Sequence, residues 1–214
     1  YNEGTLRKSA GIGTSLFRPL LDNTGLVEVT SGFLTLQSGI TNWSNDGTNN
    51  ILTGGTWTIS TAAQGADAAG VNIAGLPPVD EIAANILLDG RGTYFRDDAS
   101  GNVLTDLSRI ATDGGLSLQN GRDLTLGHLE NLGRLTVGSD STLWLDGYSQ
   151  GADGRLTIGL GGPPDSQRFG TVRSDNVVAA LNGTFQVDFQ DGFGPTAGQT
   201  FQVMKFGNRN GDFQ

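Results

Sequence analysis

Short segments in which apolar and polar residues alternate recur along most of the chain. These segments are bounded by Gly, Asn, Asp or Ser, the residues that favour tight turns. Alternation with a period of two is typical of a β-strand with one face toward a core and the other toward water. The clearest predicted strands are Phe33–Leu36, Thr56–Ile59, Asn85–Leu88, Leu116–Leu118, Leu124–Leu126, Leu143–Leu145 and Leu156–Ile158.

The spacing of these strands indicates a repeating structural unit. Leu116, Leu135 and Leu156 follow one another at intervals of 19 and 21 residues. Leu124 and Leu143, which start the intervening strands, are 19 residues apart. Alternate strands therefore return after about 19 to 21 residues, which is the period of a coil with two or three strands per turn.

A second repeat, Asn-x-Gly-x followed by an apolar residue, begins at Asn2, Asn23 and Asn131. Asn2 and Asn23 are 21 residues apart, and the same alignment matches Gly11 with Gly32. Asn tolerates the left-handed backbone of a turn, and its side-chain amide can stack on that of the next repeat. The repeats predict an all-β fold, a parallel β-solenoid (β-helix) whose inward Leu, Val and Ile stack from coil to coil. The alternative is an antiparallel sandwich with evenly spaced strands.

Two regions are predicted along the chain. Residues 1–162 are expected to form the solenoid coils, with one excursion near 61–80, where an Ala-rich stretch precedes two prolines. A second excursion near 93–113 is expected to be a polar loop, in which residues 103–110 form a helical turn or a strand. Residues 163–214 are expected to form the terminal coils or a C-terminal β cap.

The C-terminal region differs in its pattern from the rest. Its alternating segments, at 184–189 and 200–206, are longer, and aromatic residues concentrate there. A sheet that ends without cover leaves backbone groups unpaired, and a cap prevents uncontrolled strand addition at that edge. We therefore expect a cap or wider last coils in this region.

Glycine content and charge narrow the class of protein. The 34 glycines among 214 residues fit many tight turns, and the absence of cysteine excludes disulfides and thiolate metal sites. A net charge of −9 disfavours binding to nucleic acid.

The chain has no run of about 18 apolar residues, so we expect no membrane insertion by this segment. Because it starts at Tyr1 and its single methionine is Met204, we expect it to begin inside a longer precursor.

Candidates for catalysis and metal binding are few. His128 is the single histidine, and a surface or turn position explains it better than a role as general base or metal ligand. No nucleophile or zinc motif is present, so we expect a protein that is not an enzyme and needs no cofactor. Asp97, Asp98 and Asn102 offer oxygen ligands that could hold Ca²⁺, although their spacing matches no known calcium loop. The alternative is that these residues only form a solvent-exposed turn and bind no ion.

Trp57 and Trp144 are the candidates for ligand binding. Exposed tryptophan rings can stack on sugars, and Trp144 lies between Leu143 and Leu145, so alternation places its ring on the opposite face from them. The alternative is that such a ring packs under a loop or against a neighbouring chain.

Four blocks of the sequence resemble repeat regions of very large bacterial surface proteins. They are residues 2–9, 23–32, 116–123 and 195–213. The similar proteins are autotransporter-like and filamentous-haemagglutinin-like β-helical surface proteins. The resemblance implies a secreted chain at the cell surface or in the extracellular matrix, with a structural or adhesive role. It supplies no catalytic residues.

The expected partners follow from this picture. An uncovered coil end is expected to be continued by further segments of the same polypeptide or by a second copy, which would build a homo-oligomer or filament. Surface glycans are a further candidate partner. The alternative function is a carbohydrate-binding or carbohydrate-processing β-helix module.

Overall fold

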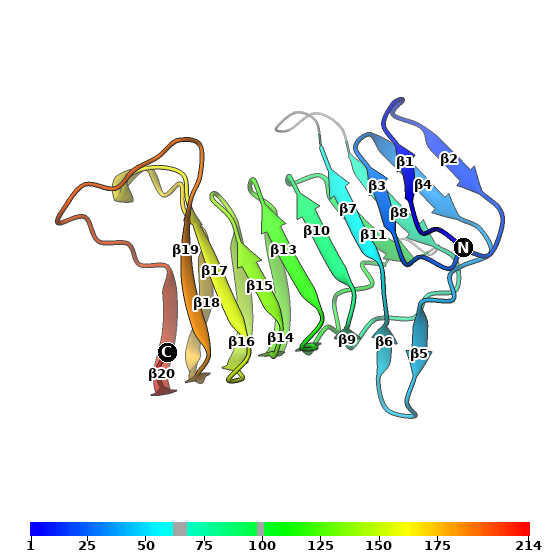
Figure 1. The fold of residues 1–214 in the computed structure, drawn as a ribbon. Coiled ribbons are helices and arrows are strands. Elements are labelled where there is room, and N and C mark those ends of the chain that lie inside the picture. The colour runs from blue at the N-terminus through cyan, green and yellow to red at the C-terminus, as the bar shows by residue number, and fades with distance from the viewer. Residues whose placement is uncertain (62–67, 98–100) are drawn as a thin grey trace. The chain divides into compact units, whose positions relative to one another are not determined.

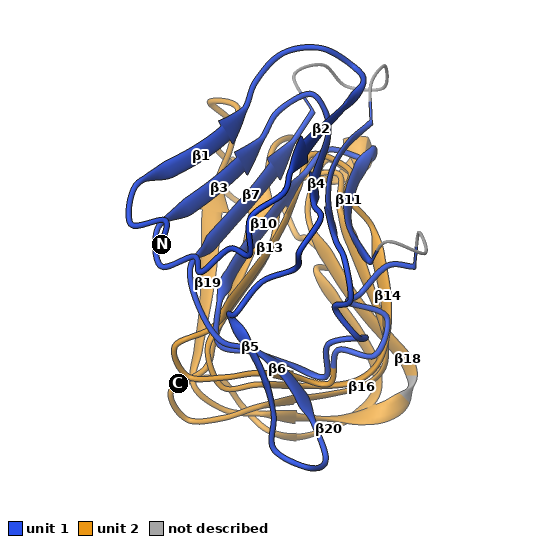
Figure 2. Ribbon diagram, turned by 90° about the vertical axis from the view of Figure 1, so that its right-hand side faces the viewer, with its two compact units in different colours: residues 1–107 blue, residues 108–214 orange. Residues whose placement is uncertain are grey.

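The computed structural model describes residues 1–61, 68–97 and 101–214 and is all-β in those ranges. Its strands fall into two compact units, Tyr1–Leu107 and Ser108–Gln214 (Figure 2). Apart from one short 3₁₀ turn, Pro164–Ser166, the described residues form no helix, and hence none that could cross a membrane. Parallel pairing dominates both units.

The first unit contains three groups of paired strands (Figure 1). The first group, in spatial order, is β1 (Thr5–Lys8), β3 (Leu26–Val29), β7 (Thr56–Ser60) and β10 (Asn85–Asp89). The second is β2 (Thr14–Phe17), β4 (Gly32–Leu36), β8 (Ala69–Ile73) and β11 (Thr93–Asp97). The third is β5 (Trp43–Asn45), β6 (Asn50–Leu52) and β9 (Glu81–Ile82). All of these pairs are parallel except β5 with β6, a hairpin that makes the third group mixed.

The second unit contains two groups of strands, and the chain alternates between them. One group is β13 (Gly115–Gln119), β15 (Arg134–Val137), β17 (Arg155–Leu160) and β19 (Thr184–Phe189). The other is β12 (Arg109–Ile110), β14 (Leu124–Asn131), β16 (Thr142–Gln150), β18 (Thr171–Leu181) and β20 (Met204–Gly211). All of these pairs are parallel.

The register confirms the spacing read from the sequence. Leu116 pairs with Leu135, and Leu135 pairs with Leu156. Leu124 pairs with Leu143 on the other group of strands. All five leucines are buried, because inward positions of successive parallel strands stack on one another. The parallel pairing makes the antiparallel-sandwich alternative wrong for these segments.

Similar columns of apolar side chains form the core of the first unit. Val27, Trp57 and Ile86 occupy register positions on three adjacent strands and are 0%, 0% and 2% exposed. The ring of Trp57 also packs edge-on against Phe95, with the ring centroids 5.6 Å apart. Burying each of these side chains contributes about 1.5–3 kcal/mol, so the columns supply much of the drive for folding.

The predicted amide stacking occurs at the first Asn block, but one predicted glycine match is wrong. Asn2 Nδ2 donates to Asn23 Oδ1 across 2.8 Å. On β2 and β4, however, Thr14 pairs with Phe33, which aligns Gly32 with Gly13 rather than with Gly11. Between the pair Lys8 with Val29 and the pair Thr14 with Phe33, the first segment has five intervening residues and the second has three, and this difference of two shifts the alignment.

The predicted excursions contain strands. β8 lies within 61–80, and β11 occupies the start of 93–113, where we predicted a polar loop, so that prediction is wrong for Thr93–Asp97. Residues 103–106 form turns, and Arg109–Ile110 form the short strand β12. These polar residues form strands because their backbones hydrogen-bond to a neighbouring strand. The polarity of the local sequence does not reveal this pairing.

The C-terminal strands were predicted in part. The strand at 184–189 is confirmed as β19, whereas the strand predicted at 200–206 begins at Met204 and continues to Gly211. β19 pairs with β17 and β20 with β18, both in parallel, so these strands continue the two groups of the second unit.

Candidate functional site

An outward-facing row of side chains crosses four adjacent strands of the second unit. Thr125, Trp144, Arg173 and Lys205 are successive register partners on β14, β16, β18 and β20. Trp144 is 40% exposed, while the leucines on either side of it are buried. The prediction that alternation turns this ring away from the core is confirmed.

A groove of about 400 Å³ lies over this row. We call it the Trp144 groove. It is lined by Thr125, Trp144, Leu145, Asp146, Arg173, Asp175 and Val177. An aromatic ring, two carboxylates and a guanidinium therefore face one hollow on an otherwise regular sheet.

A bulge in β18 forms one wall of the groove. Between two register pairs, Trp144 with Arg173 and Tyr148 with Ala179, β16 advances four residues and β18 advances six. The register of β18 against β20 shifts at the same place, between Ser174 and Val178. The extra residues interrupt the ladder and bring Asp175 and Val177 to the groove beside Trp144.

Charged groups in the groove are mostly paired with one another. The guanidinium carbon of Arg173 lies 4.7 Å from the ring centroid of Trp144, a cation–π contact. Asp175 forms ion pairs with Arg173 Nη2 and Lys205 Nζ, each at 3.4 Å. The buried Nε of Arg173 has no hydrogen-bond partner among the described residues. Asp146, the second carboxylate of the groove, forms no ion pair with another described residue.

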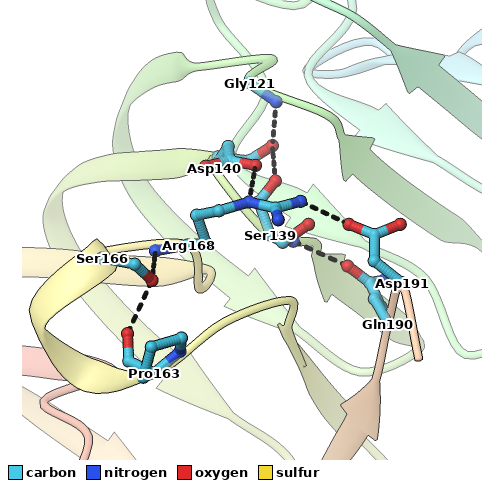
Figure 3. Close-up of polar contacts among 9 residues, drawn as sticks. Gly121, Ser139, Asp140, Pro163, Ser166, Arg168, Gln190 and Asp191 are labelled. Atoms are coloured by element: carbon cyan, nitrogen blue, oxygen red, sulfur yellow. Dashed lines mark hydrogen bonds and ion pairs between the residues drawn. The ribbon is translucent and has the colours of Figure 1, made fainter. Parts of the chain in front are cut away.

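A second polar cluster surrounds Arg168, in the loop after the 3₁₀ turn (Figure 3). Its guanidinium reaches Asp191 at 2.5 Å and Asp140 at 3.5 Å. Nearby, Gln190 Oε1 accepts a hydrogen bond from the backbone N–H of Ser139 at 2.8 Å. Asp140 and Asp191 have positive φ values of 63° and 54°, so both lie in left-handed turns. The side chain of Arg168 thus connects its own loop to the turns at Asp140 and Asp191, and we call this set of contacts the Arg168 clamp.

The structure separates the two tryptophans that we proposed for ligand binding. Trp57 is fully buried, and its indole N–H donates to the carbonyl of Gly54 at 3.1 Å. A ring in the core offers no face to a sugar, so the prediction for Trp57 is wrong. Trp144 keeps an exposed ring within a groove.

The residues proposed for calcium are engaged in local turns where the structure describes them. Asp97 Oδ1 accepts from the backbone N–H of Gly101 at 2.7 Å, and Asn102 Oδ1 accepts from Leu104 at 3.2 Å. Asp98 lies outside the described residues. Among residues 1–61, 68–97 and 101–214, no three His, Cys, Asp or Glu side chains form a group that could hold a metal ion. Calcium binding stays a prediction.

His128 lies on the exposed face of β14, beside a serine that sequence reasoning missed. Its Nε2 is 3.1 Å from Ser149 Oγ on β16. The available signal was the 19-residue repeat, which pairs His128 with Gly147 and so places Ser149, two residues further on, on the same face of the adjacent strand. Within the described part of the chain, no carboxylate hydrogen-bonds to the imidazole, so the pair lacks the third group that orients a catalytic histidine.

Comparison with known proteins adds no relative. The chain matches no protein-family model, no curated protein and no solved structure.

Proposed function

We propose that this chain is a parallel β-solenoid with a structural or adhesive role in a secreted bacterial surface or extracellular-matrix protein, and that it is not an enzyme. The in-register parallel stacking of strands 19 and 21 residues apart carries the proposal. Leu116, Leu135 and Leu156 represent it in the second unit, where each pairs with its counterpart on the adjacent strand.

A coil of this kind cannot bury its apolar face alone. Each coil covers the next, so stability grows with the number of stacked coils, and long rigid stalks result. Outward positions remain free to vary without loss of the core, which suits a protein that presents a surface to other molecules. The resemblance of residues 2–9 and 195–213 to repeats of bacterial surface proteins supports the secreted location.

Self-assembly is part of the proposal. Within the second unit, β19 and β20 are the outermost strands of their groups, and a hollow of about 390 Å³ lies beside them. Phe185, Phe206 and Phe213 are among the residues that line this hollow. An apolar hollow next to strand edges is a favourable place for one further parallel strand. We propose that further segments of the same polypeptide or a second copy of the chain supply this strand, and that a second copy would extend a filament.

Immunogold electron microscopy on the source bacterium tests the proposed location and role. Antibodies raised against the purified chain should label the surface of intact cells, or fibres between them, without permeabilisation. Gold particles confined to the cytoplasm would contradict the proposal. Sedimentation velocity of the purified chain tests assembly, because a second copy predicts a weight-average sedimentation coefficient that rises with concentration, and a concentration-independent monomer would exclude it.

A further inference from the structure

We propose that the Trp144 groove is a binding site for a neutral glycan. The inference goes beyond the proposed structural role and does not depend on it, because a glycan site needs the groove and not the filament. An exposed indole ring, a bulge beside it and the charges around both support glycan binding.

The exposed ring supplies the apolar part of such a site. Trp144 sits at an outward position of a regular strand, where a small polar residue would satisfy the fold, as Thr125 does on the adjacent strand. A pyranose ring has an apolar face of C–H groups that can lie flat on an indole. Carbohydrate and other small-ligand sites combine such apolar surface with a few placed polar groups.

The groove also supplies the polar part. Asp146 offers a carboxylate with two acceptor oxygens, and no hydrogen bond or ion pair joins it to another described residue. Arg173 offers guanidinium donors at the edge of the ring. Vicinal hydroxyls of a sugar donate and accept at once, so an acceptor and a donor beside a stacking ring match their chemistry. Thr125 adds a hydroxyl that can do both.

The bulge in β18 indicates that the groove is built rather than accidental. The pairs β13 with β15, β14 with β16, β15 with β17 and β17 with β19 run without a shift, whereas the register of β18 breaks after Trp144 on one side and after Ser174 on the other. A bulge gives up ladder hydrogen bonds, and bulges concentrate where a strand must re-aim side chains next to a functional site. Here the re-aimed residues, Asp175 and Val177, form the wall facing the ring.

The charges select a neutral ligand. Asp175 is ion-paired to both Arg173 and Lys205, and Asp146 adds a second carboxylate, so the two positive and two negative charges at the groove sum to zero. The groove therefore has no net positive charge to attract uronate or sulfate groups, and the chain's net charge of −9 repels them. A cationic ligand would compete with Arg173 for the indole face. Neutral hexose units avoid both conflicts.

Glycan binding by the purified chain tests the proposal. The probes are hexasaccharides of β-1,4-glucan, β-1,4-mannan, α-mannan and β-1,4-galactan, with polygalacturonate and a sulfated galactan as acidic counterparts. Isothermal titration calorimetry should detect at least one neutral hexasaccharide, with both acidic glycans binding at least about tenfold more weakly. No binding to any neutral probe, or tighter binding to the acidic ones, overturns the proposal.

Matched variants locate the site. Trp144→Ala should weaken binding by at least about tenfold, because an aromatic contact of this kind contributes on the order of 1.4 kcal/mol. Asp146→Asn, which preserves shape, should weaken it less. Trp43→Ala is the control, since Trp43 is 37% exposed, close to the exposure of Trp144, but belongs to the first unit. Binding that survives Trp144→Ala and Asp146→Asn, with thermal melting unchanged, would contradict the assignment.

Discussion

Asn131 donates a hydrogen bond from Nδ2 to Oε1 of Gln150, 3.3 Å away at the end of the adjacent strand. Both side chains are buried, at 0% and 4% exposure. The amide of Gln150 donates in turn to the backbone carbonyl of Asn182 at 2.8 Å. A chain of side-chain amides therefore satisfies backbone carbonyls at the ends of adjacent parallel strands, inside a region that water does not reach.

Replacing the Asn131 amide by a carboxylate should destabilise the second unit strongly. Asn131 Nδ2 also donates to the Tyr148 hydroxyl oxygen at 3.2 Å and to the Arg155 carbonyl at 3.0 Å. Asn131→Asp would replace the donor of these hydrogen bonds by a buried negative charge next to the same oxygen atoms. The free energy of unfolding should fall by about 3 kcal/mol or more. Urea denaturation followed by circular dichroism measures this.

The control for that prediction is Asn208→Asp. Asn208 is exposed, and its Oδ1 already acts as an acceptor, for the backbone N–H of Arg209 at 2.8 Å. The substitution preserves this acceptor, so the free energy of unfolding should change by less than about 0.5 kcal/mol. Equal effects of the two substitutions would mean that burial of the amide chain is not what stabilises the turns.

Gly154 should tolerate no side chain, although its backbone conformation is ordinary. A Cβ at this position would overlap the backbone carbonyl oxygen of Asn131 at the end of β14, and a backbone atom cannot move aside as a side chain can. Gly154→Ala should therefore cost about 1–3 kcal/mol of unfolding free energy. Gly194 has open space around it, so Gly194→Ala should be neutral or stabilising by up to about 1 kcal/mol. Chemical denaturation of both variants compares them directly, and a loss at Gly194 as large as that at Gly154 would refute the packing argument.

Much of the second unit could be predicted from its sequence. The strands that contain Leu116, Leu135 and Leu156 are visible in the sequence because paired parallel strands of this unit recur at intervals of 19 and 21 residues with the same apolar pattern. The first unit is less regular. Leu26 pairs with Thr56, 30 positions later, since the hairpin of β5 and β6 is inserted between them. An inserted hairpin lengthens the interval between paired strands but leaves the alternation of apolar and polar residues within each strand unchanged. The repeat length alone therefore cannot show which strands of the first unit pair.

The two tryptophans show what alternation can and cannot predict. Trp57 shares its strand face with Ile59, so the rule that placed Trp144 outside would have placed Trp57 in the core. That error was avoidable. The partnership of Trp144 with Arg173 was not predictable, because the loop with the 3₁₀ turn sets the 29-residue interval between them. The bulge that brings Asp175 to the groove has no sequence signal of its own.

Removing Arg168 should loosen one loop without unfolding the unit. Arg168 is exposed to the extent of 45%, so its pairs with Asp140 and Asp191 contribute less than about 1 kcal/mol to global stability. Its backbone carbonyl also accepts a hydrogen bond from the Gly161 N–H at 2.7 Å. Hydrogen exchange of that amide should accelerate in Arg168→Ala, while the urea midpoint moves little.

The matched variant for the clamp is Arg209→Ala. Arg209 pairs with Asp212 within a single exposed segment, so its removal should leave exchange of the Gly161 amide unchanged. If Arg168→Ala lowered the global stability by several kcal/mol, or if it left the Gly161 amide as protected as before, Arg168 would not act as a local clamp.

Tyr148 should make the protein sensitive to alkaline pH. Burial raises the pKa of this phenol well above its ordinary value of 10.0, although the hydrogen bond from Asn131 opposes the shift. The folded state therefore holds the neutral phenol, whereas the unfolded chain ionises it near pH 10. The stabilisation from Tyr148 is fully present below about pH 10 and is lost as the pH rises above this value toward the folded-state pKa.

The measurement is the free energy of unfolding between pH 9 and 11.5, in wild type and in Tyr148→Phe. The phenylalanine variant cannot ionise at this position, so the difference in stability between wild type and variant should shift by about 1.4 kcal/mol per pH unit above pH 10, to the disadvantage of wild type. Tyr1→Phe is the control, because Tyr1 is 96% exposed and meets water in both states. Its curve should run parallel to that of wild type. Parallel curves for Tyr148→Phe as well would show that the buried phenol does not couple ionisation to unfolding.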